Sequence, residues 1–379
     1  MNISIFLAYG TTAAVARQLG AGNRRAAIRQ GIDGLWLAGA IGVVVLGLGL
    51  PLARPIIDVF GGSPAVTANA VSYLRISLLG APGMLLVLAG TGILRGLQNT
   101  RTPLLISVLA NAVNVALNAT FVLGLHWGIA GSAWGTVIAQ NGAAVGYLVM
   151  VAAGARRAGV GAGFDLAGVR IAARAGAALV VRTLALQAVL LAATAIAASE
   201  GTDAIAAHQV AYRIWSLLAF ALDAIAIAGQ AITGKYLGAG DVAGARAATN
   251  RMVRWGIGCG TVFGLAVLAA RPVLPALFAA RPPVAHLMLV VLVVVAVEQP
   301  VAGVVFVLDG VLIGAGDLNY LALAQIAAAA VFGLAAMATA GTGLLGLWVA
   351  ISAWLAARFG ALAWRARGSR WLVTGAVRA

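Results

Sequence analysis

The chain has 379 residues, of which 62% are hydrophobic and only 9% are charged, against roughly 25% charged in an ordinary soluble domain. With a mean hydropathy of +1.01, it has too few polar side chains to cover a water-facing surface, and a soluble enzyme is excluded. Its net charge of +15 follows from the positive-inside rule without a nucleic-acid partner. The single cysteine, Cys259, cannot form an intramolecular disulfide or a metal cage. We therefore expect no cofactor and no metal.

Apolar runs long enough to cross a bilayer follow one another along the chain. The first piece, residues 3–15, is too short for a full crossing and is expected to be the second half of a span. Two blocks without a charged residue, 102–155 and 318–357, each hold two spans around turn-forming residues. Six single runs bring the prediction to ten complete spans, at 31–53, 70–94, 175–199, 205–233, 252–270 and 284–314.

The basic residues predict the orientation. When they are sorted by alternate loops, 19 of the 25 fall on one side, Arg358 among them, and only Arg54, Arg271 and Arg281 fall on the other. This split predicts a cytoplasmic C-terminus in the cell inner (plasma) membrane. The remaining three, Arg75, Arg182 and Arg213, lie within or near spans. We expect their side chains to snorkel to the membrane interface.

The sequence contains an internal repeat. Residues 19–22, Leu-Gly-Ala-Gly, recur at 237–240, an offset of 218, and the same offset superposes Pro82 on Pro300, Gly92 on Gly310 and Gly96 on Gly314. A constant offset over such a distance indicates two related halves. Six spans lie within one period, an even number, so both halves are expected to face the same way across the membrane.

The repeat also predicts the domain organisation. We expect an N-terminal helical bundle at 1–153 with about four and a half spans, a cytoplasmic linker at 154–172, a six-helix bundle at 173–365 and a basic cytoplasmic tail at 366–379. Subtracting the offset from the start of the second bundle gives 173 − 218 = −45. The first bundle is therefore expected to begin about 45 residues before Met1, with one and a half further spans.

Several short motifs, weak singly, form a specific set through their order and duplication. They are Gly10-Thr11-Thr12 before the first Leu-Gly-Ala-Gly, Ala207-His208-Gln209-Val210, Leu222-Asp223-Ala224, Glu298-Gln299-Pro300, and Leu308-Asp309-Gly310 leading to Gly316-Asp317. With these motifs the whole chain resembles the multidrug and toxic compound extrusion (MATE) family, most closely its DinF-like branch.

The resemblance implies an all-α polytopic membrane protein with two pseudo-symmetric six-helix bundles, the first incomplete here. It also implies a monomeric secondary transporter, not an enzyme, which exports cationic or amphipathic small molecules by antiport against H⁺ or Na⁺. Many members carry a coupling acid on the first helix, which this sequence lacks. A lipid-linked precursor flippase of the same superfold stays open as an alternative, and so does a truncated, non-transporting remnant. The flippase would need basic residues in its cavity, and only Arg75, Arg182 and Arg213 are available.

Polar residues inside the spans are the candidate functional residues, because they are costly in lipid. One polar face lies on the span at 205–233, where helical spacing places four polar residues on the same side: Tyr212, Ser216, Asp223 and Gln230. Asp223 is a candidate site for exchanging a proton or binding Na⁺, or else it hydrogen-bonds within the bundle and fixes packing.

A second polar face lies in the span after residue 102, with Asn111, Asn114 and Asn118. The resemblance implies that Asn114, Asn118 and, on the following span, Thr136 line an N-terminal polar network. It also implies that Asn118 stands where other branches often have Asp. Interhelical hydrogen bonding is the structural alternative.

Glu298 and Asp309 complete the candidates for cation or proton coupling. Their spacing puts both on one face of their span, and Pro300 permits a bend beside Glu298. Asp309 lies nearer the cytoplasmic end, where solvation or a helix-end contact is the simpler explanation. His208 is expected to be a hydrogen-bonding residue near the outer interface.

Overall fold

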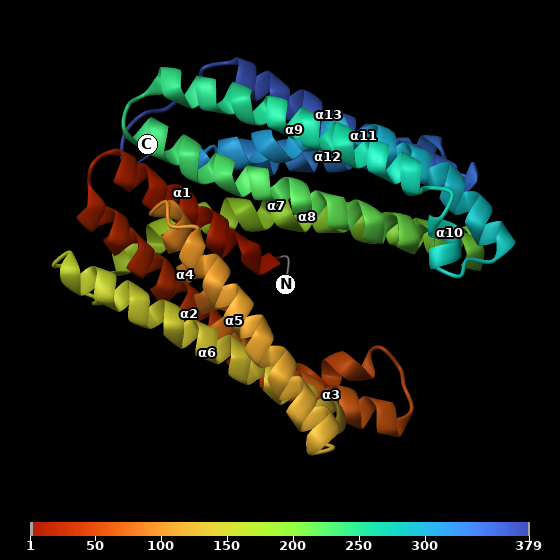
Figure 1. Cartoon of the computed structure of the whole chain (residues 1–379), viewed down its shortest axis with the longest axis horizontal. Coiled ribbons are helices and arrows are strands. Elements are labelled where there is room, and N and C mark those ends of the chain that lie inside the picture. Colours follow the sequence, from red (N-terminus) through yellow and green to blue (C-terminus); the bar gives the residue numbers. More distant parts are fainter. Residues whose placement is uncertain (1–2, 378–379) are drawn as a thin grey trace. The chain divides into compact units, whose positions relative to one another are not determined.

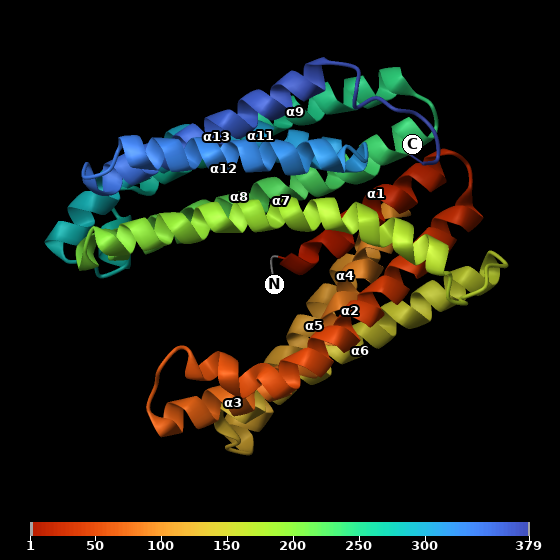
Figure 2. The same cartoon turned by 180° about the vertical axis from the view of Figure 1, so that it is seen from behind.

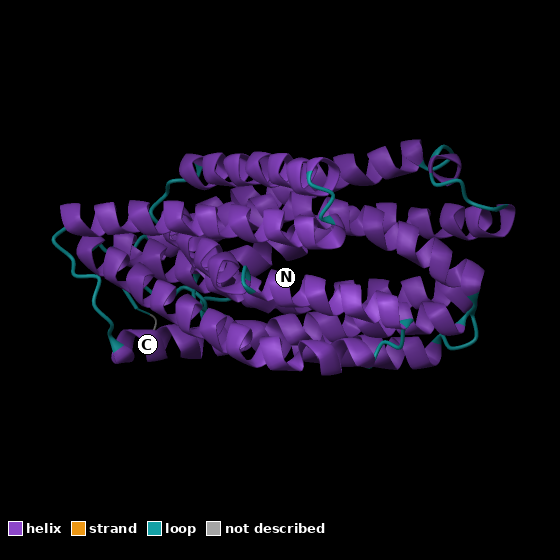
Figure 3. Ribbon diagram, turned by 90° about the horizontal axis from the view of Figure 1, so that it is seen from below, coloured by secondary structure: helices purple, strands orange, loops and turns teal. Residues whose placement is uncertain are grey.

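The computed structural model describes residues 3–377, and this part of the chain contains helices and loops but no strand (Figure 3). Nine of its helices are long and apolar enough to cross a membrane, and a bent helix pair brings the number to ten. The predicted all-α polytopic fold is therefore confirmed. The sequence predicts ten complete spans, and nine of them are continuous helices among the described residues, whereas the tenth corresponds to the bent pair. The chain divides into two compact units, 1–176 and 177–379.

In the first unit, helix α4 is central and packs against α1, α2 and α6. A short 3-10 turn, Ile3–Ile5, precedes α1, and a π-helical turn, Ala119–Gly124, follows α5. The helices of this unit, shown in red to yellow in Figure 1, are α1 (Phe6–Gly20), α2 (Arg24–Asp58), α3 (Pro64–Leu78), α4 (Ala81–Gly96), α5 (Arg101–Asn118), α6 (Gly128–Arg157) and the first residues of α7.

In the second unit, helix α11 is central and packs against α8, α9 and α13, while α12 packs on α13 (Figures 1 and 2). More of α11 is buried than of any other candidate span among the described residues. The helices are α7 (Leu166–Ser199, shared with the first unit), α8 (Thr202–Gly238), α9 (Val242–Ala270), α10 (Leu274–Leu277), α11 (Pro282–Gly314), α12 (Leu318–Ala338) and α13 (Gly343–Arg367).

Both units repeat the same helix ends at the predicted offset. After α1, the backbone N–H of Asn23 donates to Gln18 across Gly22, which has φ +76°. After α8, Asp241 donates to Tyr236 across Gly240, which has φ +77°. The positive φ explains why glycine is repeated at this turn, since an L side chain is strained in that conformation.

Glycine contacts between helices repeat in the same way. A Cβ on Gly92 of α4 would lie 2.6 Å from the carbonyl oxygen of Ala8 on α1. The corresponding Gly310 of α11 meets the backbone of Ala226 on α8, with the carbonyl carbon at 2.7 Å. Ala226 and Gly310 lie 218 residues after Ala8 and Gly92, which is the offset of the repeat. The central helix of each unit therefore touches its neighbour backbone to backbone, which requires glycine.

The two prolines that align in the repeat have different effects. The expected single span at 70–94 is two helices, α3 and α4, bent by 44° around residues 79–80, just before Pro82. By contrast, α11 runs without interruption through Pro300. Each proline nevertheless faces a glycine of the neighbouring helix. A Cβ on Gly42 would lie 2.6 Å from Cα of Pro82, and a Cβ on Gly260 would lie 2.8 Å from Cα of Pro300.

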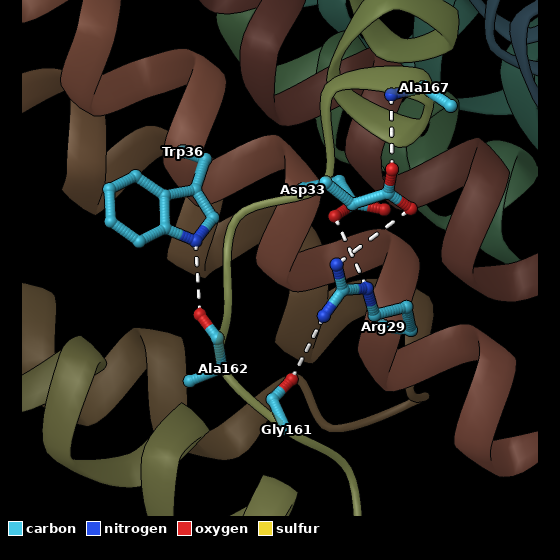
Figure 4. A network of polar contacts seen from close by, with 7 residues as sticks. Arg29, Asp33, Trp36, Gly161, Ala162 and Ala167 are labelled. Carbon is cyan, nitrogen blue, oxygen red and sulfur yellow. Dashed lines mark hydrogen bonds and ion pairs between the residues drawn. The ribbon is translucent and has the colours of Figure 1, made fainter.

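The connection between α6 and α7 is shorter than the expected linker at 154–172, because α6 continues to Arg157 and α7 begins at Leu166. Within the first unit this connection is attached to α2 (Figure 4). The Arg29 guanidinium donates to the Gly161 carbonyl at 3.1 Å and lies 3.5 Å from Asp33. The Trp36 indole N–H donates to Ala162 at 3.1 Å. Side chains of one helix thus hold the connection.

The contact between α9 and α11 generates a stability prediction. Gly260→Ala would place a methyl group against the backbone of Gln299 and Pro300, so we expect a loss of about 1–3 kcal/mol from overpacking. The measurement is thermal unfolding of the purified full chain in detergent, followed by tryptophan fluorescence.

Gly258→Ala is the matched control on the same helix, because a Cβ there has nothing within 4 Å. It should leave stability unchanged or raise it by up to about 1 kcal/mol, since alanine is the better helix former. Equal effects of the two substitutions would contradict the proposed close packing.

Candidate coupling and cavity sites

Glu298 is a buried carboxylate on the central helix of the second unit. Its side chain is 7% exposed, and the hydroxyl of Ser352 on α13 donates a hydrogen bond to its Oε1. Its Oε2 is buried and accepts no hydrogen bond from any residue in the described range 3–377. Glu298 also lies two residues before Pro300. It is therefore a membrane-embedded acid with half of its accepting capacity unused.

An aromatic cluster lies near this acid, made of His208, Tyr212 and Trp215 on α8 with Trp348 and Trp354 on α13. The His208 ring is 6.1 Å from Tyr212 and 5.8 Å from Trp348, and Trp215 is 6.5 Å from Trp354. Ser352 links the cluster to Glu298, because its Oγ also lies 2.9 Å from the Trp348 carbonyl oxygen.

The interface role expected for His208 is wrong. Its side chain is 1% exposed, and neither ring nitrogen has a hydrogen-bond partner among the described residues. The rings of Tyr212 and Trp348 lie beside the imidazole instead, and helical position alone does not reveal which neighbour covers a side chain.

Asp309 is surrounded by arginines. Arg182 on α7 donates from Nε to its Oδ1 at 3.1 Å and also contacts Oδ2 through a second guanidinium nitrogen. Arg358 on α13 lies 3.4 Å from Oδ2. The exposed fractions of the Arg182, Asp309 and Arg358 side chains are 9%, 8% and 3%. This is the most completely enclosed ion pair among those of the described residues.

The arginine group corrects three expectations. Arg182 does not snorkel, because its guanidinium is buried against Asp309. Asp309 is not solvated at a helix end, and Arg358, assigned to the cytoplasmic surface, is 3% exposed. The sequence also predicts that Asp309 is a candidate for cation coupling. Its two cationic neighbours disfavour that role, because they already compensate its charge.

A second ion pair joins the ends of α12 and α13 and is not anticipated by the sequence. Arg365 donates to both carboxylate oxygens of Asp317, at 2.6 and 3.1 Å, and its guanidinium lies 4.5 Å from the centre of the Tyr320 ring. At the equivalent point of the first unit, Asn99 accepts from the backbone N–H of Thr102 at 3.1 Å. The repeat thus keeps a polar residue at this helix start but changes its charge.

The four polar residues predicted on one face of α8 have different surroundings. Tyr212, Ser216 and Asp223 are half-buried. Gln230 is 1% exposed, and its Oε1 has no donor within residues 3–377. Its backbone meets Gly314 of α11, whose Cβ would lie 2.8 Å from the Gln230 Cα. Gln230 therefore lies in the helix contact, whereas the other three stay closer to the surface of the unit.

In the first unit, Asn114, Asn118 and Thr136 lie together. Asn114 donates to the Thr136 hydroxyl at 3.2 Å, and Asn118 donates to the Asn114 side-chain carbonyl at 3.2 Å. Asn118 Oδ1 is buried without a donor in the described part of the chain. Asn111 stands apart, because it is exposed and donates to Ser107 of its own helix at 2.8 Å. This neutral network joins α5 to α6.

Comparison with known proteins identifies the chain. The MatE family model matches residues 1–120 and 178–339. The chain belongs to this family. Its members are transporters and not enzymes, so the prediction that this chain is not an enzyme is confirmed.

Among its MatE relatives, DNA damage-inducible protein F of Escherichia coli is 31% identical over 374 residues, covering 95% of this chain and 80% of that protein. Protein DETOXIFICATION 43 of Arabidopsis thaliana is 33% identical over 83% of this chain, and the chain spans 62% of its length. These two relatives support the DinF-like branch of the family.

A solved MATE structure has the same fold. The Vibrio cholerae MATE transporter VcmN in its bent form superposes with a TM-score of 0.87 at 20% identity, covering 98% of this chain and 85% of that one. At this level of identity the likeness concerns the fold alone.

The Asp309 ion pair leads to a second stability prediction. Asp309→Asn leaves two buried guanidinium groups without their carboxylate, so we expect the free energy of unfolding to fall by about 3–5 kcal/mol. Thermal unfolding of the full chain in detergent measures the loss.

Asp203→Asn is the control, because Asp203 forms a largely exposed ion pair with Arg281 at 2.7 Å. Its loss should cost at most about 1 kcal/mol. If Asp309→Asn were as mild as Asp203→Asn, the buried arginines would have to be compensated elsewhere.

Proposed function

We propose that this chain acts as a cation-coupled antiporter that exports small organic compounds by alternating access. The observation that carries the proposal is Glu298, a buried acid on the central helix of a MatE-family fold, whose second oxygen has no donor within the described residues. A carboxylate in a membrane interior is costly unless it is protonated, paired or bound to a cation. Reversible binding of H⁺ or Na⁺ at Glu298 removes this cost.

Contrast with Asp309 supports the assignment to Glu298. Two guanidinium groups already neutralise Asp309, whereas the side chain that donates to Glu298 is the neutral Ser352. Binding of a cation therefore compensates more uncompensated negative charge at Glu298 than it would at Asp309. Asp223, half-buried on α8, is the second coupling candidate.

The position of Glu298 suggests how cation binding reaches the rest of the unit. Pro300 removes one backbone donor from α11 two residues further on, so the helix is least restrained there. Glycine contacts join α11 to α9, and α9 therefore follows any bend of α11. If the cation and the substrate favour opposite states, each lowers the affinity for the other, as antiport requires.

The neutral network of Asn114, Asn118 and Thr136 is proposed to contact substrate. Amide and hydroxyl groups donate and accept hydrogen bonds without adding charge, which suits varied cationic or amphipathic compounds. The protein is proposed to be a monomer in the inner membrane with a cytoplasmic C-terminus, as the basic residues predict. A C-terminal reporter that is active only in the cytoplasm tests this orientation.

The flippase alternative receives little support. It requires arginines available to a pyrophosphate. Of the three that the sequence offers, Arg182 is engaged with Asp309, which leaves only Arg75 and Arg213, both exposed. Direct measurement of transport distinguishes the antiporter from the non-transporting remnant.

Glu298→Gln tests the coupling role. Glutamine keeps a hydrogen bond to Ser352 but cannot exchange a proton or bind Na⁺ as a carboxylate does. We expect coupled efflux of an organic cation such as ethidium to fall at least tenfold in membrane vesicles, with unchanged protein in the membrane. Asp223→Asn should also abolish coupled efflux if Asp223 takes part.

Glu200→Gln is the matched control, because Glu200 is exposed at the end of α7 and should transport normally. Undiminished efflux in Glu298→Gln would remove Glu298 from the mechanism. No efflux from the unsubstituted chain would instead favour the remnant.

A further inference from the structure

An apolar cavity lies in the first unit, between α2, α4 and α6 and beside the connection from α6 to α7. Its volume is about 340 Å³. None of the residues that line it is charged, and the indole N–H of Trp36 already donates to the carbonyl of Ala162. An organic cation therefore finds no acid in this wall, whereas a hydrocarbon chain fits its chemistry.

The volume suits a stretch of lipid acyl chain. A cavity of 340 Å³ holds on the order of ten methylenes, since a methylene is about as large as the roughly 30 Å³ of a liquid water molecule. Trp36 and Leu148 line the cavity and are 45% and 39% exposed, on two helices that are candidate membrane spans. A chain from the bilayer that enters this hollow gives its walls the dispersion contacts that they otherwise lack.

The connection offers backbone hydrogen-bond donors beside the cavity (Figure 4). Arg29 and Trp36 hold the carbonyl oxygens of Gly161 and Ala162, each at 3.1 Å. The peptide bonds there are trans, so each N–H points opposite to the preceding carbonyl. The N–H groups of Ala162 and Gly163 therefore point away from α2, and neither donates to an acceptor among the described residues. Successive N–H groups arranged in this way bind anions.

Arginines add positive charge at the same end of α6. Arg156 and Arg157 directly follow the part of α6 that lines the cavity, and both are exposed. Arg29 is largely compensated, because it lies 3.5 Å from Asp33 and 3.8 Å from Asp165. Together these three arginines and two aspartates carry 3 − 2 = +1 charge, which favours an anionic headgroup over a zwitterionic one.

The geometry points to a binding site for one anionic phospholipid. Part of one acyl chain occupies the cavity, and the phosphate lies at the N–H groups of Ala162 and Gly163 and at the guanidinium groups of Arg156 and Arg157. The lipid would join α2 and α6 to the connection that follows α6. Binding at this site is independent of the antiport proposal; only its assignment to the cytoplasmic leaflet rests on the proposed orientation.

The test is native mass spectrometry of the purified full chain, released from detergent after incubation with phosphatidylglycerol or with phosphatidylcholine of identical acyl chains. The chain should retain one phosphatidylglycerol, with an affinity about tenfold or more above that for phosphatidylcholine. Equal retention of the two lipids, or retention of neither, would overturn the proposal. Because no transport is measured, a failure here is distinct from a failure of the antiporter.

Gly39→Leu tests the chain-binding part of the site. Gly39 lines the cavity, and a Cβ there has nothing within 4 Å, so leucine fills the space without displacing a neighbour. Retention of phosphatidylglycerol should fall about tenfold or more, since several chain methylenes lose their place. Gly47→Leu is the matched control, because Gly47 is exposed on the same helix, is equally open and lies outside the cavity. Unchanged retention in Gly39→Leu would show that the lipid binds elsewhere.

Arg156→Gln combined with Arg157→Gln tests the headgroup part. The preference for phosphatidylglycerol should fall about tenfold, while retention of phosphatidylcholine stays unchanged. The control is Arg251→Gln combined with Arg254→Gln, two exposed arginines on α9 of the second unit. Equal losses in the two double variants would indicate a general effect of positive charge and contradict the site.

Discussion

Close backbone contact between a central helix and its neighbours is the constraint on which each unit depends. In lipid, apolar side chains gain little by leaving solvent, so helix association relies on close packing and internal hydrogen bonds. Glycines at Gly92 and Gly310 allow this approach at equivalent positions of α4 and α11. Once the backbones touch, larger side chains are confined to the other faces of the helix.

The second unit buries two acids, one paired with arginines and one with a neutral hydrogen-bond donor. Asp309 is compensated by Arg182 and Arg358, which ties α7 and α13 to the central helix. Glu298 has the neutral Ser352 as its hydrogen-bond donor and keeps one oxygen unpaired within the described residues. A compensated charge stabilises one arrangement, because separating the partners is costly. An acid with neutral surroundings is instead sensitive to whatever cation reaches it.

The repeat preserves contacts more strictly than side chains. In the first unit Thr12 of α1 donates to the Gly92 carbonyl on α4 at 3.2 Å, and its counterpart in the repeat is Gln230, whose Oε1 is unpaired within residues 3–377. Gln98 adopts φ 63°, where the second unit has Gly316 at φ 70°. Backbone geometry is thus retained while polar groups differ. This pattern is consistent with two units that share an architecture and differ in the charges they bury.

The sequence by itself determined the membrane class, nine of the ten predicted spans and the two-fold repeat. These features depend on hydrophobic run length and on a constant offset, which are local or periodic properties of the chain. The resemblance already predicted that Asn114, Asn118 and Thr136 lie together. This contact joins two consecutive helices, so it does not depend on distant segments of the chain. Only the tertiary structure showed that Arg182 meets Asp309, 127 residues away, and that Arg358 and His208 are buried. A helix pattern indicates which side chains share a face, but the neighbour that covers that face, and hence whether a charge is solvated or paired, is decided by packing between distant segments.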